Sequence, residues 1–123
     1  YLINRAKPII YATSLSLYDT ILAHESLKYI LQNRDRLREE IQARQEIVFD
    51  ELGIKIEGLI VPIAIGDNKK VLEIKKELYL AGYSVGAIRQ PTVPSAIIRL
   101  IARLGQSQNE LRALCQILVR IKS

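Results

Sequence analysis

The spacing of apolar residues changes at Gly53, and this change limits the possible folds more than any other feature of the sequence. Before it, apolar residues recur at the spacing of helix turns, with a bend expected over Asn33–Asp35. After it, short runs of β-branched residues alternate with shorter helical patterns. The sequence therefore predicts a long helical segment over about residues 16–52, followed by an α/β part over about residues 54–123.

The α/β part contains several short runs with the composition of strands. The expected strands are Ile54–Ile56, "LIVPIAI" at 59–65, "YSVGAI" at 83–88 and "IIRLIA" at 97–102. Pro62 lies in the second of these runs and has no backbone N–H to donate. Its strand is therefore restricted in the places that it can take within a sheet.

Two helices are predicted among these strands from the residues at their ends. Asp67 is a candidate N-cap for a helix over about residues 68–81, and Gly82 is expected to end it. "SQNE" at 107–110 fits the capping-box pattern and opens a final helix, whose apolar stripe includes Cys115. This order of elements indicates an α+β fold, in which helices cover a small, mostly antiparallel sheet.

The charge pattern gives little support to a nucleic-acid partner, although the formal net charge is +5 at pH 7. Basic residues alternate with acidic ones, as in "NRDRLREEIQARQE" at 33–46, which is typical of a solvated helix face with i,i+4 ion pairs. The longest apolar run, at 59–65, is too short to cross a bilayer. We therefore expect neither a nucleic-acid nor a membrane partner.

A single cysteine and a single histidine limit the chemistry that the chain can perform. Cys115 cannot form an internal disulfide, fits a reducing compartment such as the cytoplasm, and is expected to be a buried hydrophobe. One residue of each kind is too few for the usual zinc sites, so no metal is expected. A catalytic triad would have to be built on His24, in the middle of a predicted helix, and no catalytic residue is assigned.

A loop with two prolines joins the last two predicted strands, in "SVGAIRQPTVPSAIIRLIARL" at 84–104. Pro91 and Pro94 fix two backbone φ angles, so that Thr92 is presented with little conformational freedom. Arg99 and Arg103 follow in or after the next strand, where a guanidinium is costly to bury without an anion. The pattern suggests a site for a carboxylate or phosphate. The alternative is a surface arginine whose stem packs on the sheet.

Three stretches, "YLINRAKPIIYATSL", "PIAIGDN" and "AIRQPTVP", resemble corresponding segments of the α-oxoamine synthases. These are pyridoxal-phosphate enzymes that condense an amino acid with an acyl-CoA and release carbon dioxide. The resemblance covers nearly the whole chain. It implies the fold of the C-terminal small domain of fold-type I pyridoxal-phosphate enzymes, in a homodimer that acts on these small-molecule substrates.

The resemblance also implies roles for three residues. Thr13 would contact the phosphate of the cofactor in the neighbouring subunit, and Thr92 would contact substrate. Arg99 would pair with the carboxylate of the amino acid. This last match needs a gap of two residues after Pro94, and Arg103 is the alternative.

None of the lysines lies in the Schiff-base motif of the family, and the sequence contains no methionine. We therefore expect the chain to be the C-terminal domain of a longer enzyme, without the large cofactor-binding domain and inactive alone. The surface around residues 9–31, where other parts of that enzyme would pack, is expected to be apolar and exposed. Which member of the family this is stays open. A free-standing α+β module that binds RNA or a small anion is the alternative from another class.

Overall fold

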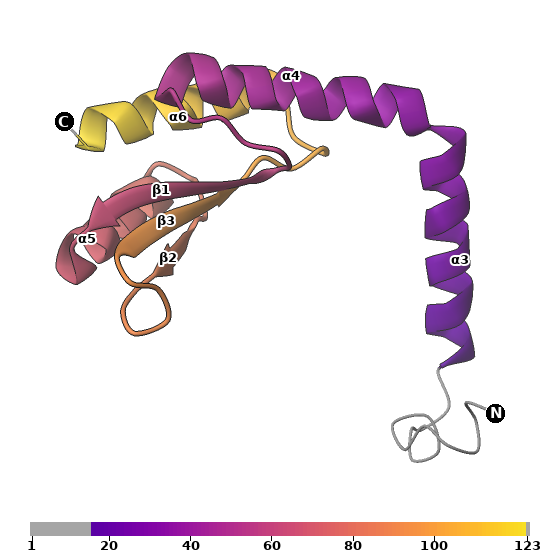
Figure 1. Cartoon of the computed structure of the whole chain (residues 1–123), viewed down its shortest axis with the longest axis horizontal. Helices are drawn as coiled ribbons and strands as arrows, with labels where there is room; N and C mark the ends of the chain where they lie inside the picture. The colour runs from indigo at the N-terminus through magenta and orange to yellow at the C-terminus, as the bar shows by residue number, and fades with distance from the viewer. Residues whose placement is uncertain (1–15, 123) are drawn as a thin grey trace. The chain divides into compact units, whose positions relative to one another are not determined.

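The computed structural model of the chain describes residues 16–122. The chain forms two compact units, residues 1–37 and residues 38–123. Figure 1 shows a helix in the first unit and a sheet with further helices in the second. Thr13, expected at the cofactor, lies outside the described residues.

The long helical segment predicted over residues 16–52 is present as two helices. Helix α3 spans Leu17–Gln32 and helix α4 spans Arg34–Leu52. Asn33 separates the two helices, within the predicted stretch Asn33–Asp35, and its backbone N–H donates to the carbonyl of Tyr29 at 3.0 Å. Gly53 follows α4 with a φ of 68°, a left-handed conformation that favours glycine at the end of a helix.

Helix α3 buries none of its residues. Its exposed large apolar residues are Leu17, Tyr18, Ile21, Leu22, Leu27, Tyr29, Ile30 and Leu31. Within the described residues, this confirms the expectation of an apolar and exposed surface in the region 9–31.

The sheet has three strands, β1 (Ile60–Gly66), β2 (Gly86–Ile88) and β3 (Ala96–Ile101). They lie in the order β1-β3-β2, and both pairs are antiparallel. Pro62 is thus on an edge strand, as its missing N–H requires. The second and fourth predicted strands are confirmed, whereas the third is reduced to three residues.

The prediction of a strand at Ile54–Ile56 is wrong, because this segment pairs with no strand. Both isoleucines are partly buried and pack against the core. Their β-branched side chains therefore indicate that the segment is partly buried. They do not indicate that its backbone forms hydrogen bonds with a neighbouring strand.

Helix α5 spans Asn68–Leu80 and helix α6 spans Gln108–Lys122, and both begin at their predicted caps. Asp67 Oδ1 accepts hydrogen bonds from the backbone of Lys70 and Lys69 at 2.7 and 2.8 Å, and these bonds lower the pKa of the carboxyl group. Ser107 and Glu110 form the reciprocal capping box, with N···O distances of 3.2 and 3.3 Å.

The core of the second unit lies between one face of the sheet and helices α4, α5 and α6. Alternate residues of the strands point into it, such as Val61 of β1 and Ile98 of β3, and both are completely buried. The opposite face carries Ile60, Pro62 and Arg99, which are exposed. The fold class is confirmed as α+β with a small antiparallel sheet, and the helices cover one of its faces. No helix within residues 16–122 has the length and apolar content needed to cross a membrane.

Candidate functional site

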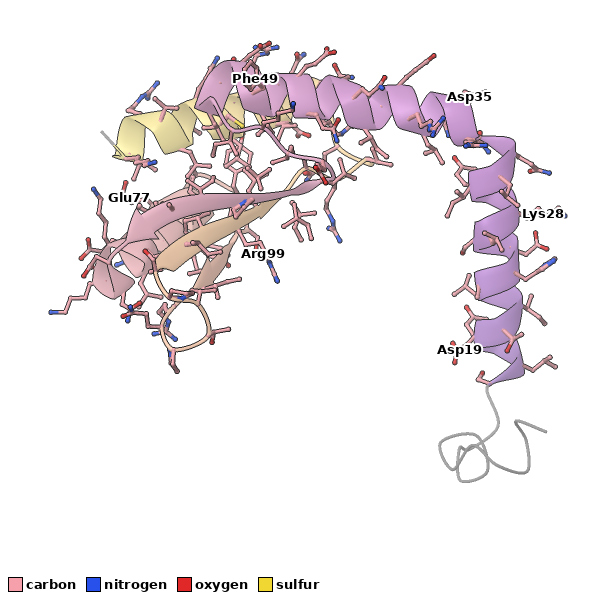
Figure 2. The ribbon with its side chains drawn as sticks, in the orientation of Figure 1. Asp19, Lys28, Asp35, Phe49, Glu77 and Arg99 are labelled. Atoms are coloured by element: carbon pink, nitrogen blue, oxygen red, sulfur yellow. The ribbon has the colours of Figure 1, made fainter. Side chains whose placement is uncertain are left out.

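Arg99 lies at the middle of the sheet, on its open face. It pairs in register with Pro62 on one side and with Gly86 on the other. A Cβ atom added at Gly86 would lie 3.5 Å from Arg99 Nε, so the arginine stem extends over a residue that has no side chain. Figure 2 shows Arg99 projecting from the sheet, away from α4 and α6. No acidic residue within 16–122 forms an ion pair with it.

A hollow of about 440 Å³ opens beside Arg99, and we call it the arginine hollow. Its lining is formed by Gly82–Gly86, Arg99–Ile101, Arg103, Gln106 and Leu114. The hollow forms because β2 pairs with β3 only from Gly86 onward. The segment before Gly86 diverges from the end of β3, and the space between them remains open.

Arg99 and Arg103, the two alternatives for the carboxylate anchor, therefore line the same hollow. Within the described part of the chain, no ion pair is formed by Arg103 either. The backbone of Arg103 is fixed, because its N–H donates to the carbonyl of Ile101 at 3.0 Å. Two guanidinium groups without acidic partners give this hollow a positive potential that suits an anion.

Arg44 of α4 holds one wall of the arginine hollow in place, and its side chain is 4 % exposed. Its Nε donates to the carbonyl of Arg103 at 3.1 Å, and its Nη2 donates to the carbonyl of Gln106 at 2.7 Å. Its Nη1 donates to the carbonyl and to the carboxylate of Glu40. The turn from Arg103 to Gln106 is thus fastened to α4.

Sequence reasoning missed Arg44, because it assigned the whole of 33–46 to a solvated helix face. The ion pair with Glu40 is of the expected i,i+4 kind, yet the arginine is buried. A signal was present in the sequence. Arg44 falls on the helix stripe between Ile41 and Val48, which faces the core.

Thr92 lies in the turn between β2 and β3 and is exposed. The turn is held by several hydrogen bonds, among them Thr92 N to Arg89 O at 3.0 Å and Gln90 Nε2 to Pro94 O at 2.6 Å. Thr92 is not among the residues that line the arginine hollow. The structure therefore brings Arg99 and Arg103 together, and the role of Thr92 at a substrate stays a prediction.

The remaining candidates for chemistry have structural explanations. Cys115 is completely buried in α6, and this burial, together with nearby Glu51, raises the pKa of its thiol to about 11. His24 lies on α3 with its Nδ1 3.4 Å from Glu25. Within residues 16–122 no cluster of His, Cys, Asp and Glu could hold a metal ion.

The sequence is similar to that of 8-amino-7-oxononanoate synthase from Helicobacter pylori strain J99, with 34% identity over 97% of this chain and 32% of that enzyme. No protein-family model matches the chain. The chain spans about a third of the length of the curated relatives that it matches. The resemblance to the α-oxoamine synthases is thereby confirmed.

Solved structures show the same fold. A crystal structure of 8-amino-7-oxononanoate synthase from Francisella tularensis aligns with 98% of this chain and 38% of its own, at a TM-score of 0.69 and 23% identity. A structure of SPT with a PLP internal aldimine aligns with 98% of this chain and 33% of its own, at a TM-score of 0.79 and 17% identity. At these identities the likeness concerns the fold alone.

Proposed function

Since the chain resembles 8-amino-7-oxononanoate synthases over nearly its whole length, we propose that it is the C-terminal small domain of a longer pyridoxal-phosphate-dependent acyltransferase. That enzyme condenses alanine with pimeloyl-CoA and releases carbon dioxide, a step of biotin synthesis. Sister activities of the α-oxoamine synthases are the alternative, namely 2-amino-3-ketobutyrate CoA ligase and 5-aminolevulinate synthase.

The observation that carries this proposal for the site is the unpaired guanidinium of Arg99. The side chain extends over Gly86 from the centre of the open sheet face, and no described acid neutralises it. A guanidinium matches a carboxylate through two parallel hydrogen bonds. Arg99 therefore binds and orients the carboxylate of the amino acid, which fixes the substrate before carbon dioxide leaves.

The cofactor would supply an electron sink for the carbanion that forms at the amino acid. The one cofactor contact that the resemblance assigns to this chain, Thr13, lies outside the described residues. The Schiff-base lysine is expected in the large domain, upstream of Tyr1. The chain by itself is then inactive. After incubation with pyridoxal phosphate and removal of the free cofactor, it should show no stable absorption band at about 420 nm, the region of a protonated cofactor imine.

The complete enzyme is expected to be a homodimer in the cytoplasm, with Thr13 serving the cofactor of the neighbouring subunit. The exposed apolar residues of α3 support burial of this helix within such an assembly. A monomeric complete enzyme with normal activity would contradict this proposal.

The role of Arg99 is tested in the complete enzyme by Arg99→Lys, which keeps the charge but removes the bidentate geometry. Alanine binding should weaken by about 1–3 kcal/mol, the scale of a lost charged hydrogen bond. Affinity for the acyl-CoA should change much less. Arg120→Lys is the matched control, because this exposed arginine of α6 is not part of the hollow.

Two results would count against this assignment. If Arg103→Lys weakened alanine binding while Arg99→Lys did not, Arg103 would be the carboxylate anchor. If neither substitution affected alanine, the arginines would be surface residues with packed stems.

A further inference from the structure

The arginine hollow has one guanidinium more than the proposed function has used. Arg99 suffices for the carboxylate of the amino acid, yet Arg103 lines the same hollow. Neither has an acidic partner within the described residues. Two like charges that share a hollow repel one another, and this repulsion is relieved when each meets an anionic group.

The two arginines can each meet an anionic group of their own, because both line the hollow and each carries its own planar guanidinium. Arg99 belongs to β3, and Arg103 lies four positions after Arg99, beyond the end of the strand. Their Cα atoms can lie at most about 14 Å apart, the length of four extended residues. The lining also includes the apolar residues Ile101 and Leu114, of which Ile101 is 49% exposed.

The position of Arg103 is fixed before any ligand binds. Its carbonyl accepts a hydrogen bond from the buried Arg44, and its N–H donates to Ile101. A side chain on a fixed backbone loses less conformational freedom when it binds a ligand than one on a loose loop. The hollow, at about 440 Å³, is within the range of small-molecule sites, about 300–1,000 Å³.

We infer that Arg103 is a specificity-determining residue that binds the distal carboxylate of a dicarboxylic acyl donor. In this arrangement, which rests on the proposed function, Arg99 holds the carboxylate of the amino acid and Arg103 holds the far end of the acyl chain. The aliphatic middle of that chain lies along the apolar lining. The inference predicts a preference for acyl-CoA substrates that end in a carboxylate over those that end in a methyl group.

The test compares pimeloyl-CoA with heptanoyl-CoA in the complete enzyme, because these donors have seven-carbon chains and differ at the distal carboxylate. Arg103→Gln should raise the KM for pimeloyl-CoA at least about tenfold, the effect of one lost charged interaction. It should leave heptanoyl-CoA and alanine unchanged. Arg103→Lys should restore part of the affinity, since it returns the charge without the planar fork.

A binding measurement on the 123-residue chain provides a readout that is independent of catalysis. Nuclear magnetic resonance titration with heptanedioate and with heptanoate should show tighter binding of the dicarboxylate, and this preference should disappear in Arg103→Gln. Circular dichroism establishes that the variant remains folded.

The outcomes separate this inference from the proposed function. If Arg99→Lys weakens alanine binding while Arg103→Gln changes neither donor, the inference is wrong and the proposed function stands. Equal use of both donors by the unmodified enzyme would also overturn it. If neither arginine affects any substrate, this inference and the role proposed for Arg99 both fail.

Discussion

Helices α3 and α6 are of similar length, 16 and 15 residues, but they use their apolar side chains in opposite ways. Helix α6 buries Leu111, Cys115 and Leu118, which recur at helical spacing on one face. Helix α3 has at least as many large apolar residues, and none of its residues is buried. Apolar composition alone therefore does not determine which helix contributes to a core.

The apolar residues of α3 are also distributed differently around the helix. Tyr18, Ile21 and Leu22 are joined by Tyr29, Ile30 and Leu31, so that adjacent positions face several directions. A helix with this pattern is typically covered on more than one side. Within residues 16–122 none of the α3 side chains is buried, and most of their stabilising effect is expected only where another surface covers them.

The largest difference between the two regions should come from truncation in the core. Ile98 of β3 is completely buried between the sheet and the helices, so Ile98→Ala should lower the free energy of unfolding by about 4 kcal/mol. Urea denaturation measures this effect. A loss below about 1 kcal/mol would show that the packed face of the sheet is not part of one cooperative core.

The second largest effect is expected for Arg44→Ala, which should lower the free energy of unfolding by about 3 kcal/mol. The carbonyl groups of Arg103 and Gln106 would lose their buried hydrogen-bond donor. Arg38→Ala on the same helix is the matched control, since Arg38 is exposed, and it should change stability by less than about 0.5 kcal/mol. Equal effects of the two substitutions would mean that Arg44 does not fasten the turn.

The buried thiol of α6 should make stability depend on alkaline pH. The pKa of Cys115 is about 11 in the folded chain, above its ordinary value of 9.0. The contribution of the neutral thiol to the free energy of unfolding is therefore fully present below pH 9. It is lost as pH rises toward 11, because the thiol of the unfolded chain ionises first. The loss should reach at most about 2.7 kcal/mol.

This dependence is measured as the difference in the free energy of unfolding between the unmodified chain and Cys115→Ala at each pH. The effects of the other groups that titrate in this range are common to both proteins and cancel. A difference that stays constant from pH 8 to pH 11 would show that water reaches the thiol.

The smallest effect is expected on α3. Ile21 is 55% exposed, so Ile21→Ala should change the free energy of unfolding of this chain by less than about 0.5 kcal/mol. In the complete enzyme the same substitution should cost about 2–4 kcal/mol if α3 is covered there. A large effect in the chain alone would mean that α3 already packs against a surface, and sedimentation would show whether that surface is a second copy.

Local signals in the sequence were sufficient for much of the fold. Asp67 and the pair Ser107 and Glu110 predicted the starts of two helices, because caps act within a few residues. The strand predicted at Ile54–Ile56 was wrong, since β-branched residues report burial and pairing depends on a distant partner.

The candidate site was less accessible to sequence reasoning. Arg99 and Arg103 were singled out as alternatives, yet their common hollow depends on where β2 separates from β3. Arg44 was missed for a related reason. Its hydrogen-bond acceptors lie 59 and 62 residues away in the chain, and no local pattern connects them.

Pro62 has a consequence for association between chains. The backbone N–H of Ala102 donates to the carbonyl of Leu59, so the alternate residues Leu59 and Val61 direct their backbone groups toward β3. The nitrogen of Pro62 therefore faces the free edge of the sheet, where it offers no donor to an incoming strand. With β2 only three residues long at the other edge, neither side is a good template for fibril-like growth.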